Sequence, residues 1–133
     1  MKNPSRRRFL ATTGTLSIAP MLPLFADTAV KDGLIDAHVP VWPADREKYP
    51  LAASSIGRAI IPEVFDQAIL SRHQEGTGVT RTVLIQMSFY EYDNSYMLDV
   101  IQSDPERYRG VAIVDHSVAG VGEGMKELAG KGV

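Results

Sequence analysis

The residues best suited to chemistry lie in the segment Asp36-Ala37-His38-Val39-Pro40. Carboxylates and imidazoles are common ligands of divalent metals and common acid–base groups. The mainly apolar run Gly33–Val39 predicts a strand, in which alternate side chains share a face. That alternation places Asp36, His38 and position 40 on one face, but proline has no side-chain donor atom for a metal. This face therefore carries one carboxylate, Asp36, and one imidazole, His38, with no side-chain donor at position 40.

The two other histidines are weaker candidates for a chemical role. His73 is expected in the last turn of a helix, where a cation interacts favourably with the helix dipole, so a structural role is favoured. His116 follows Asp115 just after a predicted strand, yet a single neighbouring pair does not define a catalytic dyad. The chain has no cysteine, which excludes disulfides, thiolate metal sites and cysteine nucleophiles. No catalytic residue can be assigned from the sequence.

Two residues that follow predicted strands are candidates for substrate binding. Trp42 follows the first strand, and Gln86 ends the second. Gln86 would line a pocket or simply be a polar strand terminus. Aromatic side chains follow both strands and would shape a substrate mouth or pack against one another: Trp42, Tyr49, Phe89, Tyr90 and Tyr92.

The remaining strands are predicted from continuous apolar runs. The second is expected at Arg81–Gln86 and the third at Arg109–Val114, each typical of a parallel strand that is buried on both faces. Gly132-Val133 is similar to the approach to a fourth strand.

Helical patterns separate these strands. A first helix is expected to begin at Pro62, because proline suits the first helical position, and to end before Gly76. Asp93 would cap a second helix, which Pro105 stops. A third helix, weakened by glycines, would follow Gly120.

Strands that alternate with helices predict an α/β fold with a parallel sheet and right-handed crossovers. A closed barrel of this class needs eight strands, and a doubly wound sheet has five or six. We therefore expect residues 27–133 to form an incomplete domain.

Several segments resemble one enzyme family. Asp36–Trp42 resembles the first-strand motif of the amidohydrolase superfamily, in which two histidines two residues apart ligate a divalent metal. Later segments resemble the amidohydrolase-related (amidohydrolase 2) branch of lactonase- and decarboxylase-like enzymes. These segments are Val41-Trp42 with Tyr49-Pro50-Leu51, Gly78–Gln86 with Asp93-Asn94, and Asp104–Ala112. The resemblance implies that the chain holds the N-terminal three βα units of a (β/α)8 TIM barrel, in a truncated domain.

This resemblance implies a metal-dependent hydrolase acting on a small molecule. It would cleave a lactone, an amide or a related C–O or C–N bond, or decarboxylate a small carboxylic acid. A divalent metal such as zinc would be the cofactor, with His38 as a ligand. Pro40 replaces the second histidine of the motif, and the family's other ligands come from later strands. We therefore expect this chain alone to be inactive and to bind a divalent metal weakly or not at all. The alternative is a non-catalytic remnant, or an exported binding protein that has lost the metal site.

The first 26 residues have the order of an export signal: a basic start, an uncharged middle and a small residue, Ala26, where cleavage is expected. Ser5-Arg6-Arg7-Arg8-Phe9-Leu10 resembles the twin-arginine signal, with Arg6 and Arg7 as the recognised pair. We therefore expect residues 1–26 to be a signal peptide read by the twin-arginine translocase, and the protein to be periplasmic or otherwise extracytoplasmic. An uncleaved membrane anchor or a chance basic N-terminus are the other interpretations.

The charge distribution excludes one class of partner. Basic and acidic residues number 14 and 16, and every acidic residue lies at Asp27 or later. The part of the chain after the expected signal is therefore acidic and has no basic patch, so nucleic acid is not an expected partner.

Overall fold

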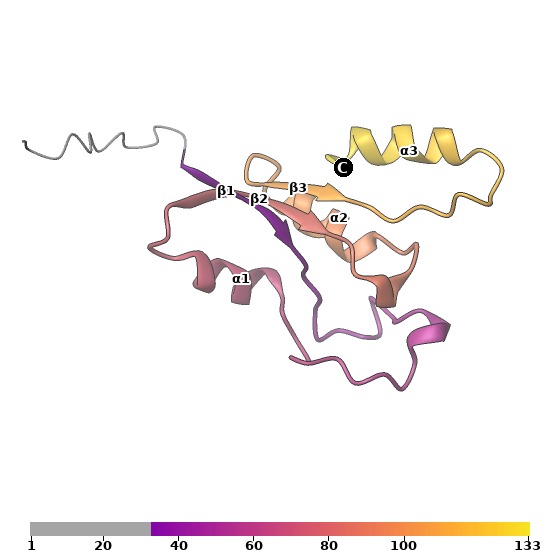
Figure 1. Ribbon diagram of the computed structural model, residues 1–133, viewed down its shortest axis with the longest axis horizontal. Coiled ribbons are helices and arrows are strands. Elements are labelled where there is room, and N and C mark those ends of the chain that lie inside the picture. The colour runs from indigo at the N-terminus through magenta and orange to yellow at the C-terminus, as the bar shows by residue number, and fades with distance from the viewer. Residues whose placement is uncertain (1–32) are drawn as a thin grey trace, which may run out of the picture.

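The computed structural model describes residues 33–133, so the expected signal, with Arg6 and Arg7, lies outside the described residues. Strands and helices alternate in the order β1 (Leu34–Val39), α1 (Gln67–Gln74), β2 (Val79–Ile85), α2 (Ser95–Ser103), β3 (Tyr108–Val111) and α3 (Val121–Gly130). Short 3-10 turns lie at Ala53–Ser55 (η1) and Ser88–Tyr90 (η2). The strands form one parallel sheet in the order β1-β2-β3 (Figure 1). The predicted mixed α/β fold with a parallel sheet is confirmed. None of the helices within residues 33–133 has the length and apolarity needed to cross a membrane.

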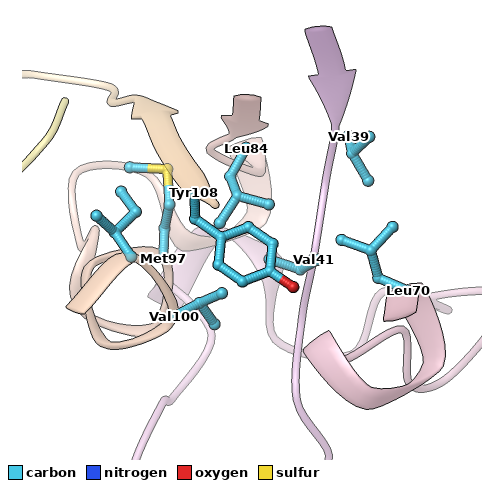
Figure 2. Close-up of a cluster of buried hydrophobic side chains, with 8 residues drawn as sticks. Val39, Val41, Leu70, Leu84, Met97, Val100 and Tyr108 are labelled. Carbon is cyan, nitrogen blue, oxygen red and sulfur yellow. The ribbon is translucent and has the colours of Figure 1, made fainter. Parts of the chain in front are cut away.

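A cluster of buried side chains joins the sheet to α1 and α2 (Figure 2). Leu84 on β2 and Tyr108 on β3 are completely buried. Burying one such large apolar side chain stabilises a fold by about 1.5–3 kcal/mol. A Cβ added at Gly110 would lie 2.8 Å from Ile101 Cδ1 and 2.9 Å from Met97 Sδ, so the glycine permits α2 to pack closely on β3. The cluster consists of Val39, Val41, Leu70, Leu84, Met97, Val100, Ile101 and Tyr108.

The first helix begins later than predicted. Proline at position 62 was expected to open it, but α1 starts at Gln67, after the cap Asp66, whose carboxylate accepts the Ile69 N–H at 2.8 Å. The reason is a distant backbone contact. Phe65 forms an antiparallel bridge with Trp42, with hydrogen bonds of 2.8 and 3.0 Å, and this contact holds Phe65 outside the helix.

The third strand is shorter than predicted. It ends at Val111 instead of Val114 because the backbone of Ile113 bonds to a side chain. Asn94 Oδ1 accepts the Ile113 N–H at 3.1 Å, and Asn94 Nδ2 donates to the Ile113 carbonyl at 2.9 Å. The Asn94 amide therefore takes the place of a neighbouring strand at this point.

The third helix forms where it was predicted, but none of its residues is buried. Beyond α3 the chain returns to the free edge of β3, where Gly110 N–H donates to the Gly132 carbonyl at 3.0 Å. This contact agrees with the predicted approach to a fourth strand, although no strand forms there within the described residues.

A long loop between β1 and α1 covers a second apolar cluster, formed by Trp42, Tyr49, Phe89 and Tyr90. Polar contacts anchor the loop at both sides. Arg46 Nη1 donates to Tyr90 Oη at 2.6 Å, while Tyr49 Oη and Lys48 Nζ donate to Asp99 Oδ2 at 2.6 and 2.9 Å. The loop is therefore fixed against η2 and α2.

Candidate functional site

The carboxyl ends of the three strands meet at one edge of the sheet because the strands are parallel. In α/β folds this edge collects ligand-binding and catalytic groups. Three of the residues singled out from the sequence lie at or just beyond it: His38 near the end of β1, Trp42 after β1, and Gln86 after β2.

His38 is exposed on β1, and it makes no hydrogen bond or ion pair within the described part of the chain. The register between β1 and β2 shifts between Leu34 and Ile35 and again between Asp36 and Val39. Asp36 lies in register with Thr82, which is buried and bonded to Gln74 of α1.

The residues present do not fit a metal centre. A catalytic zinc site needs about three protein ligands and an open position for water. Within residues 33–133 no group of three or more histidine, aspartate or glutamate side chains could hold a metal ion. His38 contributes one imidazole, and Pro40 contributes no donor atom.

Gln86 is buried and is committed to internal bonds. Its backbone N–H donates to the Val111 carbonyl at 3.0 Å, and its side-chain Nε2 donates to the Asp93 carbonyl at 2.5 Å. The side chain thus holds the segment between η2 and α2 against the end of β2. The sequence left open whether Gln86 lines a pocket or only ends the strand, and these contacts favour the second alternative.

Trp42 is buried and held in one orientation. Its indole N–H donates to the Pro62 carbonyl at 3.1 Å, and its ring meets the Phe89 ring edge-on, with 5.9 Å between centroids. These two rings, both predicted to shape a substrate mouth, line a small cavity of about 180 Å³ with Met87 and Arg58. Sequence reasoning missed Arg58. The available signal was a lone cation inside the otherwise uncharged stretch Ile56–Ile61.

The other predicted aromatic residues divide between core and surface. Tyr49 and Tyr90 belong to the buried second cluster, whereas Tyr92 is half exposed. Burial raises the pKa of Tyr49, and its hydrogen bond to Asp99 raises it further. The same hydrogen bond, followed by the one from Lys48, lowers the pKa of Asp99. These shifts belong to the anchor of the long loop.

The remaining histidines are placed as the sequence indicated. His73 lies in the last turn of α1, with its ring 5.7 Å from the Phe65 ring. His116 is exposed, and its neighbour Asp115 accepts hydrogen bonds from the hydroxyl and the N–H of Ser117. Those two bonds lower the pKa of Asp115. The Asp115 carboxylate therefore closes a local turn and does not orient an imidazole.

Solved structures similar to this chain include hydrolases. A protein of Pseudomonas putida assigned as a 2-pyrone-4,6-dicarboxylic acid hydrolase is 25% identical, with a TM-score of 0.62 over 77% of this chain. A second protein so assigned, from Acinetobacter baumannii and with citric acid bound, is 27% identical with a TM-score of 0.61. A ligand-free Agrobacterium tumefaciens protein, 20% identical with a TM-score of 0.60, shows the fold alone.

In each case the chain spans only 35% of the other protein's length. No protein-family profile and no curated protein sequence matches the chain. The two hydrolases support a hydrolase-like ancestry for most of the chain.

Proposed function

We propose that residues 33–133 are one sector of a metal-dependent hydrolase barrel of the amidohydrolase-related kind. The observation that carries this proposal is the agreement between three consecutive parallel βα units and two hydrolases at 25% and 27% identity. The substrate named for both neighbours is a lactone that carries two carboxylates. Hydrolysis of a lactone is therefore the reaction we put first, ahead of amide hydrolysis and decarboxylation.

The described residues would supply scaffold and substrate contacts. Because they do not form a metal centre, we assign no hydrolytic step to them and name no catalytic residue. His38 would act as one ligand of a metal whose other ligands lie on further strands. On this proposal, the sector is inactive without those strands.

We also propose that the protein is exported through the twin-arginine translocase and acts outside the cytoplasm. The support is the order of charged and apolar residues in the first 26 positions, with Arg6 and Arg7 at the expected place. A small-molecule substrate is the partner expected at the carboxyl edge of the sheet.

A second candidate function is binding without catalysis. Two observations favour it: proline at position 40, and the lack of a group of three ligands within the part of the chain that the structure describes. Such a protein would keep the strand scaffold and the aromatic cavity at the carboxyl edge.

A chimera separates the two functions. Residues 33–133 would replace the matching 35% of the Pseudomonas putida protein, with Pro40 kept, with Pro40→His, or with the matched control Pro40→Ala. The hydrolase proposal predicts a folded chimera that binds zinc and opens the lactone when it carries Pro40→His. Activity should be at least about tenfold lower with Pro40→Ala, because a ligand is missing.

Two results would contradict the hydrolase proposal. The chimera could fail to fold, which thermal unfolding would show. It could also fold with Pro40→His and still bind no zinc, which would favour the binding protein.

A further inference from the structure

A cavity on the amino side of the sheet brings three arginines together. Arg81 comes from β2, Arg107 from the turn before β3, and Arg109 from β3 itself. The cavity measures about 270 Å³, and none of its lining residues lines the cavity beside Trp42. Because an apolar cavity of about 150 Å³ is large enough for benzene, this one has room for a small ion or molecule.

Two of these arginines are held in place by internal hydrogen bonds. Arg107 Nη2 donates to Gln74 Oε1 at 3.0 Å. Arg109 Nη1 donates to the carbonyl of Tyr108 at 2.8 Å and to the carbonyl of Pro105. A guanidinium carries several further N–H donors, so these bonds orient the two groups without using all of their donors.

The positive charge of the three arginines is not neutralised within residues 33–133. None of them forms an ion pair there, although the carboxylate of Glu106 also lines the cavity. Arg81 and Arg109 are exposed, and the Arg81 guanidinium makes no hydrogen bond with any described residue. Like charges that are gathered in one place repel one another, and a bound anion would relieve that repulsion.

Arg107 shows which kind of partner is missing. Its Nε is buried and has no hydrogen-bond acceptor among the described residues. Buried N–H groups are nearly always paired, so an unpaired one calls for an explanation. This part of the chain therefore has a surplus of donors and lacks acceptor oxygens.

From these features we infer that the cavity binds a phosphate group, free or on a small organic ester, with its oxygens on Arg81 and Arg109 and with Arg107 beside them. A tetrahedral phosphate presents acceptors in several directions, which suits arginines that come from two strands and a turn, whereas the two oxygens of a carboxylate lie in one plane. The three guanidinium charges outweigh the single carboxylate of Glu106. This site is independent of the proposed hydrolysis, because it shares no residue with the carboxyl edge and requires neither metal nor turnover.

Isothermal titration calorimetry of the full chain at constant ionic strength would test the site, with inorganic phosphate, glycerol 3-phosphate and acetate as ligands. We expect saturable binding of one phosphate group per chain and at least about tenfold weaker binding of acetate, because charge-assisted hydrogen bonds are lost. Equal binding of both phosphate compounds would show that the site accepts an ester. Tighter binding of inorganic phosphate would identify the free ion as the ligand, and both results support the site.

Variants assign the binding to individual side chains. Arg81→Gln and Arg109→Gln should each weaken phosphate binding at least about tenfold, and Arg81→Lys should keep part of the affinity because it keeps the charge. Arg58→Gln is the matched control, since it removes the same charge from an exposed arginine that does not line this cavity. Circular dichroism would verify that each variant is folded.

Three results would overturn the inference. The first is the absence of saturable binding with both phosphate compounds. The second is a loss on Arg58→Gln as large as that on Arg81→Gln and Arg109→Gln, or no loss in any of them, since the effect would then not come from this cavity. The third is acetate that binds as tightly as phosphate. The chimera tests the hydrolase proposal separately, so an inactive chimera beside a chain that binds phosphate through Arg81 would refute that proposal and leave this site in place.

Discussion

Replacement of Asn94 by alanine should destabilise the carboxyl edge of the sheet. This side chain is 6% exposed and makes three hydrogen bonds: to the Tyr92 carbonyl at 3.0 Å, to the Ile113 carbonyl at 2.9 Å, and from the Ile113 N–H at 3.1 Å. The backbone of Ile113 finds no strand partner there among the described residues. Within residues 33–133, the Asn94 amide is therefore the only hydrogen-bond partner of the Ile113 backbone.

The size of the effect follows from these bonds. Each contributes about 0.5–1.5 kcal/mol net, and water can replace part of the loss because Ile113 is only half-buried. We expect Asn94→Ala to lower the free energy of unfolding by about 2 kcal/mol. Urea unfolding followed by the fluorescence of Trp42, at one protein concentration, would measure the change.

A matched control is available on α2. Gln102 carries the same amide group but is exposed, so Gln102→Ala should change the free energy of unfolding by less than about 0.5 kcal/mol. A loss for Asn94→Ala as small as that of the control would refute the reasoning, since the Asn94 amide would then not support the strand end.

Three further outcomes are expected. Replacement of Arg6 and Arg7 by lysine should leave the precursor in the cytoplasm, because an ammonium cannot reproduce the paired guanidinium groups; unchanged periplasmic yield in a fractionation assay would contradict twin-arginine export. The lowered pKa of Asp99, caused by bonds from Tyr49 and then Lys48, means that its contribution to stability is present above the ordinary value of 3.8 and is lost as pH falls below it. Asp99→Asn should therefore flatten this acid-side loss in thermal unfolding, and an unchanged pH profile would argue against the anchor. The outer edges of β1 and β3, which no other strand within residues 33–133 covers, should cause self-association, which size-exclusion chromatography would detect; a stable monomer would mean that the sheet needs no partner.

The order of elements could be predicted because it depends on local patterns. The apolar run Val83–Ile85 predicted a buried parallel strand, and β2 contains it. Met97, Val100 and Ile101 recur at helical spacing, and all three are buried on α2. Such patterns show which face of a strand or helix is buried. Packing of these apolar faces against one another forms the sheet and the helices that lie on it.

What the sequence did not reveal depends on contacts between distant residues. The start of α1 is set by the bridge between Phe65 and Trp42, and the end of β3 is set by Asn94. The position of Arg58 beside Trp42 follows from the path of a long loop, which no periodicity describes. Neither could the register shift near His38 be deduced from alternation alone.

The most direct test of the central claim is the zinc content of the purified full chain, compared with that of its His38→Ala variant. The claim is that residues 33–133 bring one imidazole to a hydrolase scaffold and do not hold a metal themselves. It predicts far less than one zinc per chain after dialysis, with no difference between the two proteins, because a single exposed imidazole cannot compete with water and buffer. One tightly bound zinc per chain, lost on His38→Ala, would contradict it.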